Sequence, residues 1–221
     1  MNYGTYEYFL NGKPTGVSET FDIKYEPPDK KITNSIRYAK PFNTTIVVEV
    51  VESLNYLDWF SVSFQKDNVK VHAIYEFDDD SFYFQRKINY EIVNDETIIL
   101  PKTCKIFPLM RCFQGQTILQ VAENQDFITV LVPDIQNPND VQNLLKPTFD
   151  ERRAENLGKE NIAFYQENSI TSEANVYQYF SKHYDENSRF WIDHDGLLIA
   201  YRFAQSPDKI WEVFLTTNKH R

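Results

Sequence analysis

Residues 81–93 read SFYFQRKINYEIV, and this stretch decides the fold class of the chain. The even positions hold mostly apolar side chains, namely Phe82, Phe84, Arg86, Ile88, Tyr90 and Ile92. The odd positions hold mostly polar side chains, namely Tyr83, Gln85, Lys87, Asn89 and Glu91. Successive side chains of a β-strand point to opposite faces, so this alternation predicts a strand over residues 82–92 with one buried face and one wet face.

The same alternation recurs along most of the 221 residues. It predicts further strands at about residues 3–10, 17–25, 33–38, 44–51, 57–65, 68–77, 96–100, 127–132, 176–184, 189–193, 197–203 and 210–216. Residues 109–116 fit either a short helix or a turn. Residues 133–158 lack the alternation and contain a helix-start pattern, so we expect a helical insertion there. The pattern predicts an all-β fold, a large antiparallel β-barrel or curved half-barrel with one or two short helices, as a single domain over residues 1–221.

The charge and the absence of long apolar runs exclude several classes of partner. The chain carries 23 basic and 32 acidic side chains, so its net charge is −9. We expect no nucleic-acid partner, because affinity for a phosphate backbone comes mainly from Lys and Arg. No apolar run reaches the roughly 20 residues of a membrane-spanning helix, and the opening MNYGTYEYFL does not resemble a secretory signal. We therefore expect a cytoplasmic protein with no integral membrane segment.

Recognisable catalytic and metal-binding motifs are missing. The sequence has no nucleophile elbow, no HExxH zinc motif, no phosphate loop and no dinucleotide fingerprint. Cys104 and Cys112 do not have the spacing of a zinc site, and we expect two reduced thiols. The residues 193–196 (DHDG) fit a hairpin turn better than a calcium loop. We expect neither a metal nor a cofactor.

Two charged residues lie on faces that the alternation assigns to the core. Arg86 lies between Phe84 and Ile88, and Glu19 has a similar place within residues 17–21. An isolated buried charge is very unfavourable, so each needs a partner. Either these charges form structural ion pairs, or Arg86 presents its guanidinium to an anionic or polar group of a ligand inside the barrel.

Three stretches together resemble a known family: residues 107–115 (FPLMRCFQG), 130–133 (VLVP) and 190–201 (FWIDHDGLLIAY). Their order is similar to that in a family of bacterial proteins described as glycolipid-binding. The hairpin NGKPTG at residues 11–16 and the terminal hairpin resemble, more distantly, bacterial half-barrel proteins related to lipoprotein carriers. The resemblance implies a barrel or half-barrel whose hollow takes an acyl or glycolipid-like ligand. It assigns no catalytic residues.

Three functions fit these observations. The leading prediction is non-catalytic binding of a hydrophobic or amphipathic, lipid-like small molecule in the barrel interior. The residues predicted to bind it are three polar contacts and four wall residues, Arg86, Arg111 and Arg202 with Trp59, Trp191, Tyr201 and Phe84. One alternative is a lyase or isomerase with acid–base residues at the barrel mouth, drawn from His183, His194, Asp193 and Glu19. The other is a structural or assembly protein with a solid interior. The oligomeric state is not predicted.

Overall fold

The computed structural model of the protein describes residues 2–54, 56–163, 171–182, 184 and 187–220, and strands dominate it. The elements in chain order are β1 Asn2–Leu10, β2 Lys13–Glu26, β3 Lys30–Ala39, the 3-10 turn η1 Lys40–Phe42, β4 Thr44–Ser53, β5 Tyr56–Lys66, β6 Val69–Phe77, β7 Ser81–Ile88, β8 Glu91–Ile99, β9 Lys105–Ile106, α1 Arg111–Ala122, β10 Ile128–Pro133, β11 Pro147–Ala163, β12 Thr171–Phe180, β13 Arg189–Ile192, β14 Leu198–Ser206 and β15 Lys209–His220.

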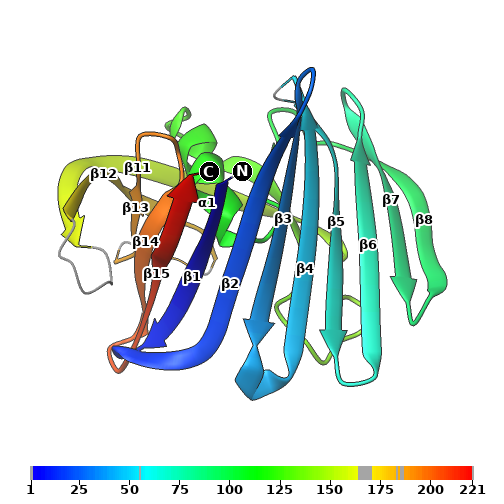
Figure 1. Ribbon diagram of the computed structural model, residues 1–221. Coiled ribbons are helices and arrows are strands. Elements are labelled where there is room, and N and C mark those ends of the chain that lie inside the picture. Colours follow the sequence, from blue (N-terminus) through cyan, green and yellow to red (C-terminus); the bar gives the residue numbers. More distant parts are fainter. Residues whose placement is uncertain (1, 55, 164–170, 183, 185–186, 221) are drawn as a thin grey trace.

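All the strands belong to one curved sheet (Figure 1). Its 15 strands follow the order β8-β7-β6-β5-β4-β3-β2-β1-β15-β14-β13-β12-β11-β10-β9. From β1 to β8 and from β10 to β15, consecutive strands pair antiparallel, and β1 also pairs antiparallel with β15. Within the described residues only β9 and β10 pair in parallel. The predicted all-β class is confirmed in its curved, open form, with β8 and β9 at the two edges.

The stretch of residues 81–93 forms two strands rather than one. β7 ends at Ile88 and β8 begins at Glu91, and the residues between them, Asn89 and Tyr90, have φ angles of 45° and 77°. The prediction of a single strand is wrong because a two-residue turn keeps the alternation in phase, and tyrosine does not mark a turn. The buried face predicted for the β7 part is confirmed, whereas Tyr90 is exposed.

The predicted helical insertion at residues 133–158 is also wrong. Residues 141–145 form turns, and β11 extends from Pro147 across most of the rest of this region. In β11 the side chains of Asp150 and Arg152 are buried, whereas the side chain of the preceding residue, Phe149, is exposed. Charged residues therefore face the interior here, and the alternation that usually identifies a strand is reversed.

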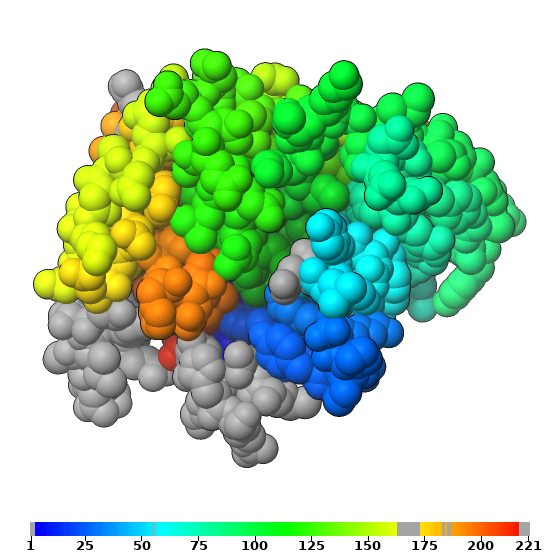
Figure 2. Space-filling view, turned by 90° about the horizontal axis from the view of Figure 1, so that it is seen from above, coloured from blue at the N-terminus to red at the C-terminus, as the bar shows by residue number. Residues whose placement is uncertain are grey.

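The chain between β9 and β11 fills the concave side of the sheet. In Figure 2 this green segment lies between the yellow and orange strands on one side and the blue and cyan strands on the other. Its side chains join those of the sheet in one buried cluster. Tyr75 on β6 stacks on Phe60 with ring centroids 4.3 Å apart, and its hydroxyl donates a 2.5 Å hydrogen bond to the carbonyl of Leu145. The interior is therefore mostly packed, and the hollow expected from the sequence is reduced to pockets beside this segment.

Helix α1 lies close against the β13–β14 hairpin. A Cβ atom at Gly115 would come within 2.3 Å of the Gly196 carbonyl oxygen and 2.9 Å of the Leu198 nitrogen, so only glycine fits. The hairpin turn predicted at residues 193–196 is confirmed, because the Asp193 carboxylate accepts hydrogen bonds from backbone nitrogens within it. No helix among the described residues has the length and apolar character needed to cross a membrane.

Candidate functional site

A buried ion pair joins the first strands to the start of α1. Glu19 on β2 is fully buried, and its Oε2 accepts hydrogen bonds from Arg37 Nε at 3.0 Å and Nη2 at 2.8 Å on the neighbouring strand β3. The same oxygen accepts a 3.0 Å bond from the Tyr8 hydroxyl. Glu19 thus has the partner that its position on an apolar face required.

This pair also holds the N-terminus of α1. Met110, at the N-cap position, provides no side-chain cap, and the first turn contains no acidic residue. The other carboxylate oxygen of Glu19 accepts the backbone N–H of Arg111 instead, and Arg37 Nη2 donates to the carbonyl of Leu109 at 3.1 Å. A carboxylate at a helix N-terminus satisfies free N–H groups and interacts favourably with the helix dipole. The ion pair therefore fixes the direction in which the Arg111 side chain leaves the helix.

The Arg111 guanidinium contacts neutral side chains. It donates to the hydroxyls of Tyr8 at 3.2 Å and Tyr201 at 3.3 Å, and to the side-chain oxygen of Gln114. Its central carbon lies 4.7 Å from the centre of the Tyr201 ring, a cation–π contact. Within the described residues, none of the hydrogen bonds from this guanidinium ends on a carboxylate, which distinguishes Arg111 from Arg37.

Strand β11 brings a second group of charges to the same place. Arg152, which is 5% exposed, donates from Nη1 to the Tyr179 hydroxyl at 3.0 Å and lies 3.4 Å from Asp150 Oδ2. Lys182 Nζ lies 2.7 Å from the other oxygen of Asp150. Burial alone would raise the pKa of Asp150, but the Lys182 hydrogen bond and the Arg152 charge hold it below its usual value. Arg152 Nε has no hydrogen-bond partner among the described residues.

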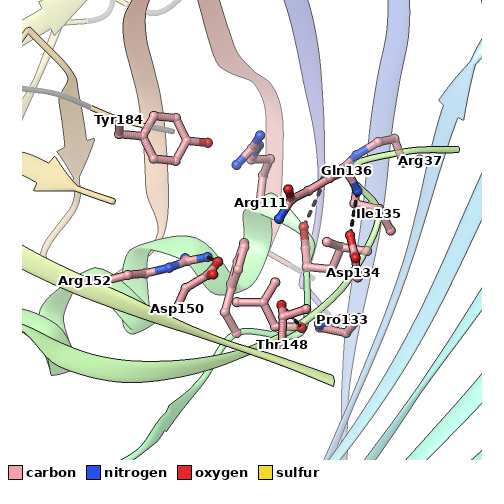
Figure 3. Close-up of a pocket in the computed structure, with 13 residues that line it drawn as sticks. Arg37, Arg111, Pro133, Asp134, Ile135, Gln136, Thr148, Asp150, Arg152 and Tyr184 are labelled. Carbon is pink, nitrogen blue, oxygen red and sulfur yellow. Dashed lines mark hydrogen bonds and ion pairs between the residues drawn. The ribbon is translucent and has the colours of Figure 1, made fainter. Parts of the chain in front are cut away.

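A pocket of about 150 Å³ lies between these groups, and we call it the arginine pocket after Arg37, Arg111 and Arg152 (Figure 3). Part of its wall is apolar, and the remaining lining is polar or acidic. The apolar lining residues are Phe107, Leu109, Val132, Pro133 and Ile135. The other lining residues are Asp134, Gln136, Thr148, Asp150 and Tyr184.

The pKa of Tyr184, which lines the pocket, reflects the positive charge around it. In Figure 3 the Tyr184 hydroxyl points toward Arg111, with Arg152 on the side of β11. Burial alone would raise the pKa of Tyr184, yet the charge and hydrogen bonding of Arg111 and the charge of Arg152 lower it. A titratable group with a perturbed pKa in a cavity is a common feature of functional sites.

The residues predicted to bind a ligand are only partly brought together. Arg111 and Tyr201 are in contact beside the arginine pocket. Arg86 is buried, but it donates to the carbonyls of residues 141, 142 and 144 and to Asn94, so it secures the turn before β11. Phe84 packs on Tyr75 beside it, with ring centroids 5.2 Å apart.

The other predicted residues do not line the pocket. The Arg202 side chain is 56% exposed and lies 3.8 Å from Glu212. Trp191 is half-buried and donates from Nε1 to Glu160 at 3.0 Å, and Trp59 is half-buried on β5. The candidate site therefore lies at the start of α1 rather than along the barrel wall.

The acid–base residues considered for an enzyme are also dispersed. Asp193 caps its hairpin turn, and the His194 side chain is 89% exposed beside Asp195, whereas Glu19 lies in the buried ion pair. His183 lies outside the described residues. Within the described part of the chain, no group of three or more His, Cys, Asp or Glu side chains is placed to hold a metal ion.

Four residues of the site were not predicted from the sequence, namely Arg37, Asp150, Arg152 and Tyr184. The sequence did contain a signal for Arg37. Arg37 and Glu19 lie directly opposite each other in the β2–β3 register, so aligning the two predicted strands to place opposite charges side by side would have paired them. The charges of β11 gave no such signal, because they occupy alternating positions in a stretch without an apolar face.

Comparison with known proteins supports the fold alone. No protein-family model matches the chain, and no curated protein matches its sequence. The structure is similar to the crystal structure of a β-barrel-like protein of domain of unknown function DUF1849 from Brucella abortus, with a TM-score of 0.55 and 10% sequence identity. The match covers 100% of this chain and 97% of the other. It supports a barrel-like fold across the whole chain, compatible with ligand binding, and does not support membership of a glycolipid-binding or lipoprotein-carrier family.

Proposed function

We propose that the protein binds a small amphipathic molecule in the arginine pocket without catalysing its conversion. The observation that carries this proposal is the Arg111 guanidinium, whose hydrogen-bond acceptors among the described residues are all neutral and which lies beside a pocket with apolar walls. Ligand sites typically combine apolar walls with a few fixed polar groups that orient the ligand. Leu109 and Ile135 supply part of that apolar wall, and Arg111 supplies the polar end.

The pocket volume limits the size of what enters it. A cavity of about 150 Å³ accommodates one benzene molecule, and the arginine pocket has about this volume. A lipid-like ligand predicted from the sequence would therefore place only its polar end and the first few carbons here. The rest of a longer molecule would lie outside the pocket.

An enzyme receives less support from this geometry. Proton transfer needs an acid or base within hydrogen-bond reach of the reacting group. Of the acid–base residues predicted for the enzyme, the three that the structure describes, Glu19, Asp193 and His194, do not line the arginine pocket, whereas Asp134, Asp150 and Tyr184 do. The alternative of a structural or assembly protein agrees with the mostly packed interior, and it predicts that no small molecule binds in the pocket.

The test uses benzyl alcohol, a neutral amphipathic probe with a ring of the right size, measured by isothermal titration calorimetry. We expect a Kd of about 0.1–1 mM, as is typical of a ligand with so few atoms. The variant Ile135→Trp fills the pocket and should weaken binding at least tenfold, about 1.4 kcal/mol. The matched control Ile36→Trp adds the same ring on the exposed face of β3 and should bind as the wild type does.

Two results would count against the proposal. The first is no binding by a wild-type protein that unfolds cooperatively, which favours the assembly alternative. The second is equal binding by Ile135→Trp and Ile36→Trp, which places the probe elsewhere on the protein.

A further inference from the structure

We propose that the polar end of the ligand is a single carboxylate, held jointly by Arg111 and Arg152. This inference rests on the proposed function and makes it specific, because it names the chemical class that the arginine pocket selects. It predicts preference for a small monocarboxylic acid over its neutral analogue and over the corresponding phosphate ester.

The charges around the pocket leave one positive charge in excess. Arg37 is paired with Glu19, and Asp150 lies between Arg152 and Lys182. Asp134 adds one more carboxylate to the lining. Counted over the described residues that line the pocket or pair with its lining, four cationic side chains therefore accompany three carboxylates. A monoanion neutralises this excess, whereas a phosphate monoester, with a charge of about −1.5 to −2 at neutral pH, exceeds it.

Two buried donors at this site lack acceptors. Arg152 Nε and Gln114 Nε2 have no hydrogen-bond partner among the described residues, and both residues are at least 95% buried. Buried N–H groups without acceptors are rare, because each loses its bonds to water without replacement. Gln114 contacts the Arg111 guanidinium, and Arg152 lines the pocket itself. The structure thus leaves Arg152 Nε, in a residue that lines the pocket, without an acceptor among the described residues.

A carboxylate matches this donor set in shape and in number. Its two oxygens accept up to about four hydrogen bonds and pair well with the planar fork of a guanidinium. Arg111 at present donates to tyrosine hydroxyls and an amide oxygen, which are weaker acceptors than a carboxylate. The apolar side chains of Leu109 and Ile135 then face the hydrocarbon part of the acid.

The experiment compares three probes that share one ring: benzoate, benzyl alcohol and phenyl phosphate. At neutral pH we expect benzoate to bind about 10- to 100-fold more tightly than benzyl alcohol, because it forms charge-assisted hydrogen bonds with the arginines. Phenyl phosphate should bind more weakly than benzoate. Arg111→Met should weaken the binding of both benzoate and benzyl alcohol, but benzoate much more strongly, so that the preference for benzoate is lost.

Arg153→Met is the matched control. Arg153 neighbours Arg152 on β11, but its guanidinium lies over the ring of Phe180 at 4.5 Å and pairs with Glu155, so it does not line the pocket. This variant should retain the full preference for benzoate. If Arg111→Met fails to fold, Arg152→Met provides the second test, with the same loss of preference expected.

Tyr184 gives an independent readout. Arg111 and Arg152 lower its pKa, so a carboxylate that neutralises them should raise that pKa toward its usual value. The tyrosinate absorbance of Tyr184, obtained as the difference between wild type and Tyr184→Phe, should therefore appear at higher pH when benzoate is bound.

The outcomes separate the two proposals. Equal affinity for benzoate and benzyl alcohol, or tighter binding of phenyl phosphate, overturns the carboxylate assignment and leaves the proposed function standing. Binding of benzoate without any change in the Tyr184 titration also overturns it, because the acid then lies elsewhere. If none of the three probes binds, the proposed function fails, and this inference fails with it.

Discussion

Replacing Glu19 with glutamine tests whether the buried ion pair holds the start of α1. The Glu19 carboxylate accepts two hydrogen bonds from Arg37, one from the Tyr8 hydroxyl and one from the backbone N–H of Arg111. Glutamine keeps the size of the side chain but removes the charge and turns one acceptor atom into a donor. Arg37, whose side chain is 11% exposed, is then left buried close to the Arg111 guanidinium.

The expected loss of stability is about 3–5 kcal/mol, the range observed when one partner of a buried pair is removed and the other charge remains. For a chain of this length that corresponds to a decrease in Tm of about 6–20 °C. The burial of Glu19 supports a value within this range rather than the small one typical of surface pairs, because no solvent screens the charge.

Urea denaturation followed by circular dichroism measures the change in the free energy of unfolding. The control Glu212→Gln removes a carboxylate whose partner, Arg202, is largely exposed, and it should change stability by less than about 1 kcal/mol. The double variant with Arg37→Met should lose clearly less than the sum of the two single variants, because it leaves no unpaired charge. A loss below about 1 kcal/mol for Glu19→Gln, or strict additivity in the double variant, would refute the reasoning.

Three further predictions concern packing, the β11 turn and alkaline pH. Gly115→Ala should destabilise by about 2–4 kcal/mol in thermal unfolding, because its Cβ would come within 2.3 Å of the Gly196 carbonyl oxygen. Arg86→Met should lose about 2–4 kcal/mol and speed amide exchange in residues 141–145, because Arg86 donates to the carbonyls of residues 141, 142 and 144 in this turn. Burial raises the pKa of Tyr8 from 10 to about 12, so its share of stability is present below pH 10 and is lost between about pH 10 and 12. In urea titrations Tyr8→Phe should flatten this alkaline loss by about 2–3 kcal/mol.

Each of these has a control and a contradictory outcome. Gly12→Ala is the control for Gly115→Ala, because a Cβ at Gly12 meets no atom within 4 Å although φ is +71°. It should lose only the backbone strain of about 1 kcal/mol. An equal loss of stability in Gly115→Ala would exclude the steric explanation. Lys87→Met, beside Arg86 on the other face of β7, should leave exchange in residues 141–145 unchanged. An unaltered alkaline transition in Tyr8→Phe would show that other groups control it.

Most of the sheet could be predicted because its strands follow one simple rule. In β4, for example, Ile46, Val48 and Val50 are buried and alternate with more exposed neighbours, as the sequence pattern requires. Turn positions were predicted less well where the turn keeps the alternation in phase, as at Asn89 and Tyr90. Local periodicity identifies the strands, but it does not say where two strands meet without a glycine or proline.

The candidate site was the part that the sequence concealed. Strand β11 turns Asp150 and Arg152 toward the interior, so the rule that apolar residues face inward gives the wrong answer there. Helix α1 buries Cys112, Gln114, Thr117 and Ile118 on several faces, because sheet and loops surround it, and it therefore lacks an amphipathic stripe. Prediction from the apolar–polar pattern fails where polar groups are buried, and such places are frequently functional.

The pairing of β1 with β15 determines when the sheet can be completed during protein synthesis. β1 is made among the first residues, yet one of its two neighbours belongs to the last strand of the described chain. On the ribosome, the β1–β8 section therefore exposes the edge of β1, which the finished sheet covers with β15, and an open edge is prone to pairing with other chains. A premature stop codon before β15 would leave two sheet sections that no longer pair with each other, so we expect even late truncations of this protein to be lost to aggregation or proteolysis.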